Sequence, residues 1–296
     1  MKLYSRYLAS LLIFVFSQAC TEIIDIDLPE HEEKIIVNSF FTSGEQIKVH
    51  LSKSIPVLED SIPLCDNAFV RLLEGNILID TLHRDGDYYY SDVLAQPSKE
   101  YSLIINVPGM DSVVCHDVIP ELVPIQSYKL ADSLMIDEYG CVVMQFEFDF
   151  IDPPGINYYE ISMNIDPWYL WFMNNTDPVI TTTGILDYEP ETLIFSDNLF
   201  DGKAASIKVN YSVEAYVFPR IGNDPKYEYN LNVSFRSISE SYYLFKQKQI
   251  VYLFSLQSDI FTGASEPVQL YSNVNGGYGI FAGYSSDDRT INVVVQ

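Results

Sequence analysis

Short runs of Tyr, Phe and β-branched residues, separated by turn residues, recur along most of this chain and constrain its fold more than any other feature. The 296 residues include 22 Tyr and 17 Phe. Aromatic and β-branched residues suit the pleated, half-buried surface of a sheet. In residues 46–52, for example, apolar and polar side chains alternate, which is the period of a strand with one buried face. The sequence therefore predicts a mainly β protein.

Seven of these runs fall between residues 34 and 122, which we predict to form one domain. Thr42-Ser43-Gly44-Glu45 joins the first two as a hairpin turn. This number of strands in about 90 residues predicts a β-sandwich of immunoglobulin or fibronectin type III kind. The predicted strands cover residues 34–41, 46–52, 68–73, 77–82, 88–90, 101–107 and 113–119.

Residues 123–296 predict a larger β-rich domain with one packed helix, since Pro120 and Pro124 indicate a boundary. Ser237 and Glu240 resemble a capping box. The helical spacing of apolar residues after them predicts a helix over about 240–256, with Lys246, Lys248 and Gln249 pointing outward. Strands are predicted over 127–134, 141–150, 158–165, 193–195, 206–218, 227–235 and 290–295.

The first 19 residues have the composition of a secretory signal peptide. Lys2 and Arg6 precede an apolar run over residues 8–16, which is too short to span a bilayer. Cys20 follows, as in a bacterial lipoprotein signal, so we predict that Cys20 is lipidated. The lipobox is imperfect, because Ser17 stands where Leu is usual and Gln18 is bulky. Ordinary cleavage before Cys20 and an uncleaved anchor are the alternatives.

Residues 20–33 form an acidic tether, and the mature chain as a whole is strongly acidic. The full chain has 17 basic and 41 acidic residues, and removal of Lys2 and Arg6 with the signal peptide changes the net charge from −24 to −26. Such a surface repels nucleic-acid phosphates. The composition excludes nucleic-acid binding.

Three cysteines remain after Cys20, at positions 65, 115 and 141. An odd number leaves at least one free in a single chain. Cys65 and Cys115 fall in the same predicted domain, where an oxidising compartment allows them to pair. The alternative is that all three are buried thiols that pack as small apolar residues.

No constellation of residues predicts catalysis, a cofactor or a metal site. His31, His50, His83 and His116 are scattered over separate strands or loops, without the spacing of a zinc site. The second predicted domain contains no histidine, which argues against a Ser-His triad there. We therefore expect a protein that is not an enzyme and has no cofactor.

Two short motifs are interpreted as structural. Residues 197–202 resemble part of a calcium loop but lack its alternating oxygen ligands, so a turn at Asp201-Gly202 is the better interpretation. Gly276, Gly277 and Gly279 predict a tight turn or a close approach of two backbones.

The segment Trp168-Tyr169-Leu170-Trp171-Phe172-Met173 contains both tryptophans of the chain. Flat aromatic rings stack on ligands and anchor protein interfaces. Trp168, Tyr169, Trp171 and Phe172 are therefore the candidate residues for binding a ligand or partner. The alternative is that the segment is inserted into the core.

Three local patterns together resemble a known family. They are residues 25–29 (DIDLP) with the strand that begins at Lys34, residues 195–203 (FSDNLFDGK) and residues 266–282 (EPVQLYSNVNGGYGIFA). In this order and spacing they resemble a Bacteroidota lipoprotein family known as domain of unknown function 4249, over essentially the whole mature chain. The resemblance implies an accessory role beside TonB-dependent outer-membrane receptors and carries over no catalytic residues.

Taken together, these features predict a surface-exposed lipoprotein of the outer membrane, anchored through Cys20. We expect a non-enzymatic accessory or ligand-binding component that works with a TonB-dependent receptor in nutrient uptake. The alternative is a cell-surface adhesion or envelope-structural lipoprotein.

Overall fold

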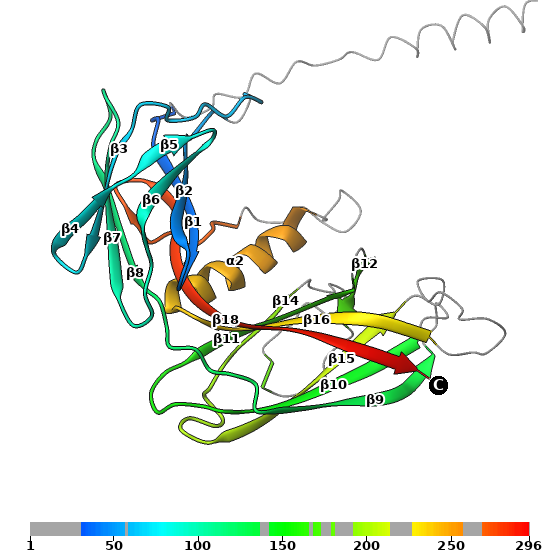
Figure 1. Cartoon of the computed structure of the whole chain (residues 1–296). Coiled ribbons are helices and arrows are strands. Elements are labelled where there is room, and N and C mark those ends of the chain that lie inside the picture. Colours follow the sequence, from blue (N-terminus) through cyan, green and yellow to red (C-terminus); the bar gives the residue numbers. More distant parts are fainter. Residues whose placement is uncertain are drawn as a thin grey trace, which may run out of the picture. The chain divides into compact units, whose positions relative to one another are not determined.

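The computed structural model describes residues 31–56, 59–136, 142–165, 168–172, 179–180, 192–213, 227–256 and 268–295. Over these residues the strands form three sheets, of nine, five and four strands, and the chain also contains one helix, α2 (Figure 1). The predicted mainly β fold with a packed helix is thereby confirmed. Residues 33–296 form one compact unit.

The nine-stranded sheet is the element around which the rest is built. Its strand order is β12-β11-β16-β18-β1-β2-β6-β5, with β14 also paired to β11. The strands are β1 (Ile35–Thr42), β2 (Gln46–Lys53), β5 (His83–Asp85), β6 (Tyr88–Leu94), β11 (Tyr158–Ile165), β12 (Trp168–Tyr169), β14 (Thr192–Ser196), β16 (Tyr227–Ile238) and β18 (Tyr278–Val295).

The two smaller sheets come from different parts of the chain. The five-stranded sheet has the order β17-β8-β7-β3-β4 and the four-stranded sheet the order β13-β15-β10-β9. The former contains β3 (Phe69–Glu74), β4 (Ile77–Thr81), β7 (Glu100–Asn106), β8 (Val113–Val118) and β17 (Val274–Asn275). The latter contains β9 (Ser127–Ile136), β10 (Val142–Ile151), β13 (Trp171–Phe172) and β15 (Ala204–Val213).

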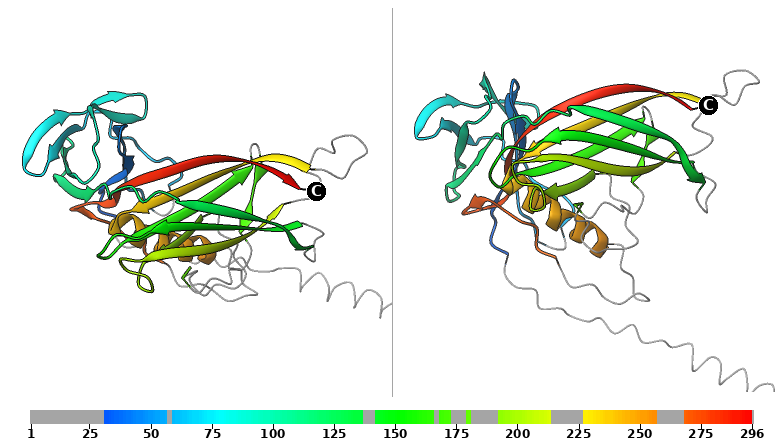
Figure 2. Two further views of the ribbon diagram at one scale, coloured as in Figure 1. Left: turned by 60° about the horizontal axis from the view of Figure 1, so that its bottom comes forward. Right: turned by 90° about the horizontal axis from the view of Figure 1, so that it is seen from below.

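The 18-residue strand β18 connects the two halves of the nine-stranded sheet. Its first residues pair in parallel with β1, and from Tyr284 onward it pairs antiparallel with β16. Figure 2 shows β16 and β18 side by side over most of their length. The strand predicted over 290–295 is therefore only the last third of a longer one.

Two of the glycines in residues 276–279 permit β18 to approach β1 closely. A Cβ atom added to Gly279, whose φ is +110°, would lie 1.9 Å from the carbonyl oxygen of Val37, and one added to Gly277 would lie 2.4 Å from that of Ile35. No side chain fits at these distances. The predicted close approach of backbones is confirmed, and Gly276 forms the turn, with φ +85°.

Both smaller sheets pack on the same face of the nine-stranded sheet, which we call its inner face. Alternate residues of β18 show this, because Phe281 lies in the first hydrophobic core whereas Ile291 and Val293 lie in the second. The first core is closed by the five-stranded sheet. It includes Val274, so β17 and the start of β18 complete the N-terminal sandwich.

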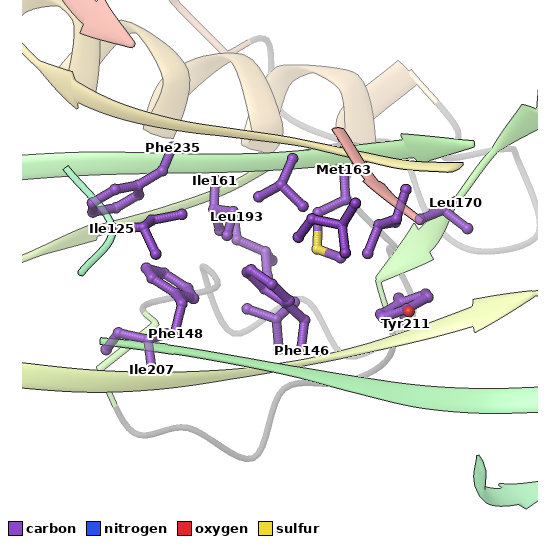
Figure 3. Close-up of a cluster of buried hydrophobic side chains, with 14 of the residues drawn as sticks. Ile125, Phe146, Phe148, Ile161, Met163, Leu170, Leu193, Ile207, Tyr211 and Phe235 are labelled. Atoms are coloured by element: carbon purple, nitrogen blue, oxygen red, sulfur yellow. The ribbon is translucent and has the colours of Figure 1, made fainter. Parts of the chain in front are cut away.

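The second core lies between the inner face and the four-stranded sheet. Figure 3 shows Phe146 and Phe148 of β10 pointing toward the side chains of β11 and β16. The ring centroid of Phe148 lies 5.0 Å from that of Phe235, and Phe146 and Phe150 stack on either side of Phe148. Such ring pairs stabilise the core beyond the area they bury.

Helix α2 (Glu240–Leu256) packs on the opposite, outer face of the nine-stranded sheet (Figure 1). The predicted helix is confirmed, but its cap is not Ser237. The Ser239 hydroxyl accepts a hydrogen bond from the amide of Tyr242 at 3.2 Å, which is N-cap geometry. Ser237 cannot cap the helix because it still belongs to β16, where its hydroxyl accepts a hydrogen bond from the amide of Val123.

Cys65 and Cys115 are free, buried thiols, and Cys141 lies outside the described residues. Burial raises the pKa of the Cys115 thiol to about 12. Both cysteines pack in the first core as small apolar residues. The domain boundary between residues 122 and 123 stays a prediction.

Candidate functional site

A buried ion-pair network lies on the outer face of the nine-stranded sheet beneath α2. Glu160 of β11 is directly opposite Arg236 of β16, so both side chains leave the same face. Glu160 is fully buried, and Arg236 Nη1 lies 2.8 Å from its Oε2 atom. From α2, Lys246 Nζ lies 3.7 Å from Glu160 Oε1, and the Tyr242 hydroxyl donates to Oε2 at 2.7 Å.

This network corrects the prediction that Lys246 points outward. The helical spacing placed Lys246 on the polar face of α2, but the carboxylate of Glu160 lies beneath that part of the helix. A buried carboxylate needs a cation or hydrogen-bond donors to offset its loss of water. Lys246 and Arg236 supply these opposite charges.

The electrostatics hold Arg236 in its charged form. Burial acts to lower the pKa of Arg236, but the negative charge of the neighbouring Glu160 carboxylate outweighs it and raises the pKa above its usual value. Burial, reinforced by Glu160, also raises the pKa of Tyr242, so its hydroxyl stays protonated. Arg236 and Lys246 thus face a single carboxylate within this network.

Arg236 also lines a cavity of about 450 Å³, which lies beside the network. This volume is within the range of about 300–1,000 Å³ that small-molecule sites occupy. The cavity is built by the β1–β2 turn, the β6–β7 loop, the linker before β9, and strands β16 and β18. Its lining consists of Thr42, Ser43, Glu45, Pro97, Leu122, Arg236, Tyr284, Ser285, Ser286 and Asp288.

The guanidinium group of Arg236 is held against an aromatic ring at this cavity. Its Cζ atom lies 5.0 Å from the ring centroid of Tyr284 on β18, which is a cation–π distance. Its Nη1 atom is used by Glu160 and by the Tyr242 hydroxyl, at 3.3 Å from the latter. Its Nε atom is buried and has no hydrogen-bond partner among the described residues.

Two carboxylates lie at the same cavity as Arg236. Asp288 accepts hydrogen bonds at Oδ1 from the hydroxyls of Ser234 and Ser286, which fix its position on β18. Glu45 is placed by the β1–β2 turn, whose Gly44 has φ +82° and donates its amide to the carbonyl of Ala95. The cavity therefore presents one cation, two anions and several hydroxyls.

Strand β18, which lines part of the cavity, is held in place where the N-terminal sandwich meets α2. The Asp117 carboxylate of β8 accepts hydrogen bonds from the Ser239 hydroxyl and from the Gly283 amide, the latter at 3.0 Å. Burial raises the pKa of Asp117, although both hydrogen bonds act to lower it. One buried side chain thus joins β8, β18 and the start of the helix.

A second hollow, of about 440 Å³, lies on the same outer face. Its lining includes Lys48, whose Nζ atom lies 3.7 Å above the ring centroid of Tyr88. Phe40, also in its lining, packs edge-on against Tyr242 of α2. Among the described residues that line this hollow there is no carboxylate, whereas the lining of the first contains two.

Asp152, Asp197 and Asp201 offer carboxylate oxygens within 4.8 Å of one another. Each accepts a hydrogen bond from a nearby backbone amide, namely those of Gly202, Asn157 and Gly155 respectively. Gly202 has φ +67°. These hydrogen bonds fix the conformation of a turn, as predicted for Asp201-Gly202.

Of the residues predicted to bind, Cys20 lies outside the described residues, whereas the backbone of the aromatic segment is described. Trp168 and Tyr169 extend the nine-stranded sheet through β11, and Trp171 and Phe172 extend the four-stranded sheet through β15. The segment thus passes from the edge of one sheet to the edge of the other. Between the two pairs Leu170 is buried in the second core (Figure 3).

Sequence reasoning missed Arg236, Glu160 and Tyr284. Arg236 and Tyr284 occupy positions of strands that alternate in the ordinary way, where a solvated side chain is the usual outcome. The one available signal was Glu160, a charged residue between the apolar residues Tyr159 and Ile161. Only the position of α2 turns that glutamate into a buried group.

A profile of the family described as "Domain of unknown function (DUF4249)" matches residues 21–290. No curated protein sequence matches the chain significantly. Across the described part of the chain, no helix has both the length and the apolar character to cross a membrane.

Proposed function

We propose a function from the premise that this chain belongs to the DUF4249 family. The proposed role is that of a lipid-anchored, non-enzymatic ligand-binding component of the outer membrane. In this proposal it works beside a TonB-dependent receptor in nutrient uptake and is exposed at the cell surface of a member of the Bacteroidota. The family resemblance of the sequence supports the partner, and the cavity at Arg236 supports ligand binding.

The observation that carries ligand binding is the fixed position of Arg236 at the cavity. Its strand is paired on both sides, its Nη1 atom is held by Glu160 and Tyr242, and Tyr284 packs against its guanidinium. A group fixed before the ligand arrives loses little conformational entropy on binding. This is the property expected of a binding site.

The lipid at Cys20 gives the proposed mechanism its second part. Each buried methylene contributes about 0.8 kcal/mol to membrane association, so two or three acyl chains anchor a protein durably. The tether over residues 20–33 then confines the folded unit to the membrane surface. Confinement raises the effective concentration of the binding site next to a receptor in the same membrane.

Cys20→Ser is the variant that tests this proposal. We expect the wild-type protein to carry acyl chains by intact-mass analysis and to co-purify with an outer-membrane receptor. The variant should lose both properties. An unmodified Cys20 in the native protein, or the absence of any receptor from the wild-type preparation, would overturn the proposal.

The aromatic segment is the proposed contact with the partner. We expect Trp168→Ala combined with Trp171→Ala to reduce receptor co-purification without unfolding the chain. Loss of the folded state in circular dichroism would instead assign the two rings to the core.

A further inference from the structure

The Arg236 cavity contains side chains of positive and of negative charge, and this restricts the ligands that it can bind. Ser286 lies directly opposite Arg236 across the β16–β18 ladder, and Asp288 lies two residues further along on the same face. Diagonal neighbours in an antiparallel pair are about 7–8 Å apart. A cation and an anion at this separation can bind the two oppositely charged ends of one small molecule.

The guanidinium of Arg236 is the end of the cavity that takes an anion. Its Nη1 atom is held by Glu160 and Tyr242 and its Nε atom is buried, but the side chain is 28% exposed at the cavity, so a ligand reaches it from the side of Nη2. Carboxylates and phosphates both match this planar group. The two carboxylates at the cavity disfavour the more highly charged phosphate.

Asp288 and Glu45 identify the other end. Both hydrogen bonds that Asp288 accepts go to Oδ1, which leaves Oδ2 for a ligand. Two carboxylates would repel a ligand with negative charges only, and a ligand with positive charges only would bring no acceptor for the guanidinium of Arg236. A ligand that carries one carboxylate and one ammonium group satisfies all three residues.

We infer that the Arg236 cavity binds a short peptide or α-amino acid, with its carboxylate at Arg236 and its ammonium group at Asp288 and Glu45. Leu122 and Pro97 give the cavity an apolar part for a side chain. This inference rests on the proposed function, because it names the class of nutrient that the binding component captures.

Calorimetric titration of the full-length mature protein in detergent tests the inference. The probes are the dipeptide alanyl-leucine, its N-acetylated form, its C-amidated form and galactose. We expect alanyl-leucine to bind, and each modification to weaken its binding about tenfold or more, because each removes one member of a charge pair. Galactose should not bind.

Variants of the cavity sharpen the test. Asp288→Asn should weaken the binding of alanyl-leucine, because the ammonium group of the dipeptide loses a partner. The same substitution should leave the binding of the N-acetylated form unchanged, since that form has no ammonium group. Arg236→Lys keeps the charge opposite Glu160 but loses the planar fork, so it should weaken the dipeptide while the thermal melt shows a folded chain. Asp87→Asn, an exposed turn residue outside the cavity, is the matched control and should change nothing.

The inference is overturned if alanyl-leucine gives no heat of binding at millimolar concentration, or if blocking either end leaves its affinity unchanged. The inference is also overturned if galactose binds and Asp288→Asn leaves the affinity for galactose unchanged. Receptor co-purification does not depend on this titration. If the receptor is retained and the dipeptide fails, only the ligand class is wrong and the proposed function stands.

Discussion

The inner and outer faces of the nine-stranded sheet are made by alternate residues of the same strands, yet they differ in chemistry. On β16, Leu231, Val233 and Phe235 face inward and pack in an apolar core. Arg236, the next residue, faces outward and reaches Glu160 and Tyr284. The inner face is stabilised by area removed from water. The outer face combines an apolar cluster under α2 with buried charges, each of which needs a partner of opposite sign.

The two faces differ in the substitutions that they tolerate. An apolar core responds to volume and can partly collapse around a deletion. A buried charge has no such option, because removal of one partner leaves the other without compensation. The sites suited to bind a polar ligand are accordingly on the outer face, beside the only helix of the described residues.

The largest expected effect is at the inner face. Phe148→Ala removes a fully buried ring that contacts Phe146, Phe150 and Phe235, and should lower the free energy of unfolding by about 3–5 kcal/mol. Urea denaturation measures it. Phe69→Ala, at a ring that is 54% exposed, is the control and should stay within about 0.5 kcal/mol of wild type.

Glu160→Gln tests the outer face with almost no change of shape. It leaves Arg236 and Lys246 close together without their carboxylate, and should cost about 3 kcal/mol in the same denaturation experiment. Glu147→Gln, which breaks a 3.9 Å pair with Lys208 at the surface, should cost less than about 1 kcal/mol. Equal costs for the two would show that the buried pair contributes no more than a surface one.

Ser239→Ala distinguishes the cap seen in the structure from the one expected at Ser237. It removes both the acceptor for the Tyr242 amide and the donor to the Asp117 carboxylate, and should destabilise the protein by about 1–2 kcal/mol. Ser241→Ala in the first turn of α2 is the control and should change stability little, since alanine favours a helix. No effect at Ser239 would contradict the assigned cap.

The smallest expected effect is a pH dependence at Asp117, whose carboxylate joins β8, β18 and the start of α2. Burial raises its folded pKa above the unfolded value of about 3.9, so the unfolded chain releases its proton first. Stability is therefore lost as the pH rises from the unfolded pKa to the folded one.

Asp117→Asn removes this titration. The stability of the variant relative to wild type should be greater at pH 7 than at pH 4, as measured by urea denaturation at both values. A difference that is the same at the two values, or that has the opposite sign, would show that Asp117 is not held protonated by burial.

The mainly β fold, the helix over 240–256 and the buried side of most strands could be predicted from the sequence, because alternation and helical period depend only on neighbouring residues. It also indicated the close approach at Gly277 and Gly279. It did not indicate that Asp287 to Arg289 continue β18, because a charged run resembles a loop. In the folded chain Arg289 pairs with Asp287 and donates to the carbonyl of Ile125.

The ion-pair network and the cavity on the outer face could not be predicted from the sequence, because both depend on the tertiary structure. Arg236 and Glu160 are 76 residues apart, and α2 must cover them before either is buried. The cavity likewise combines the β1–β2 turn with β16 and β18, which no local pattern connects. Strand alternation states which residues share a face, but not which element covers that face, since covering depends on contacts between distant parts of the chain.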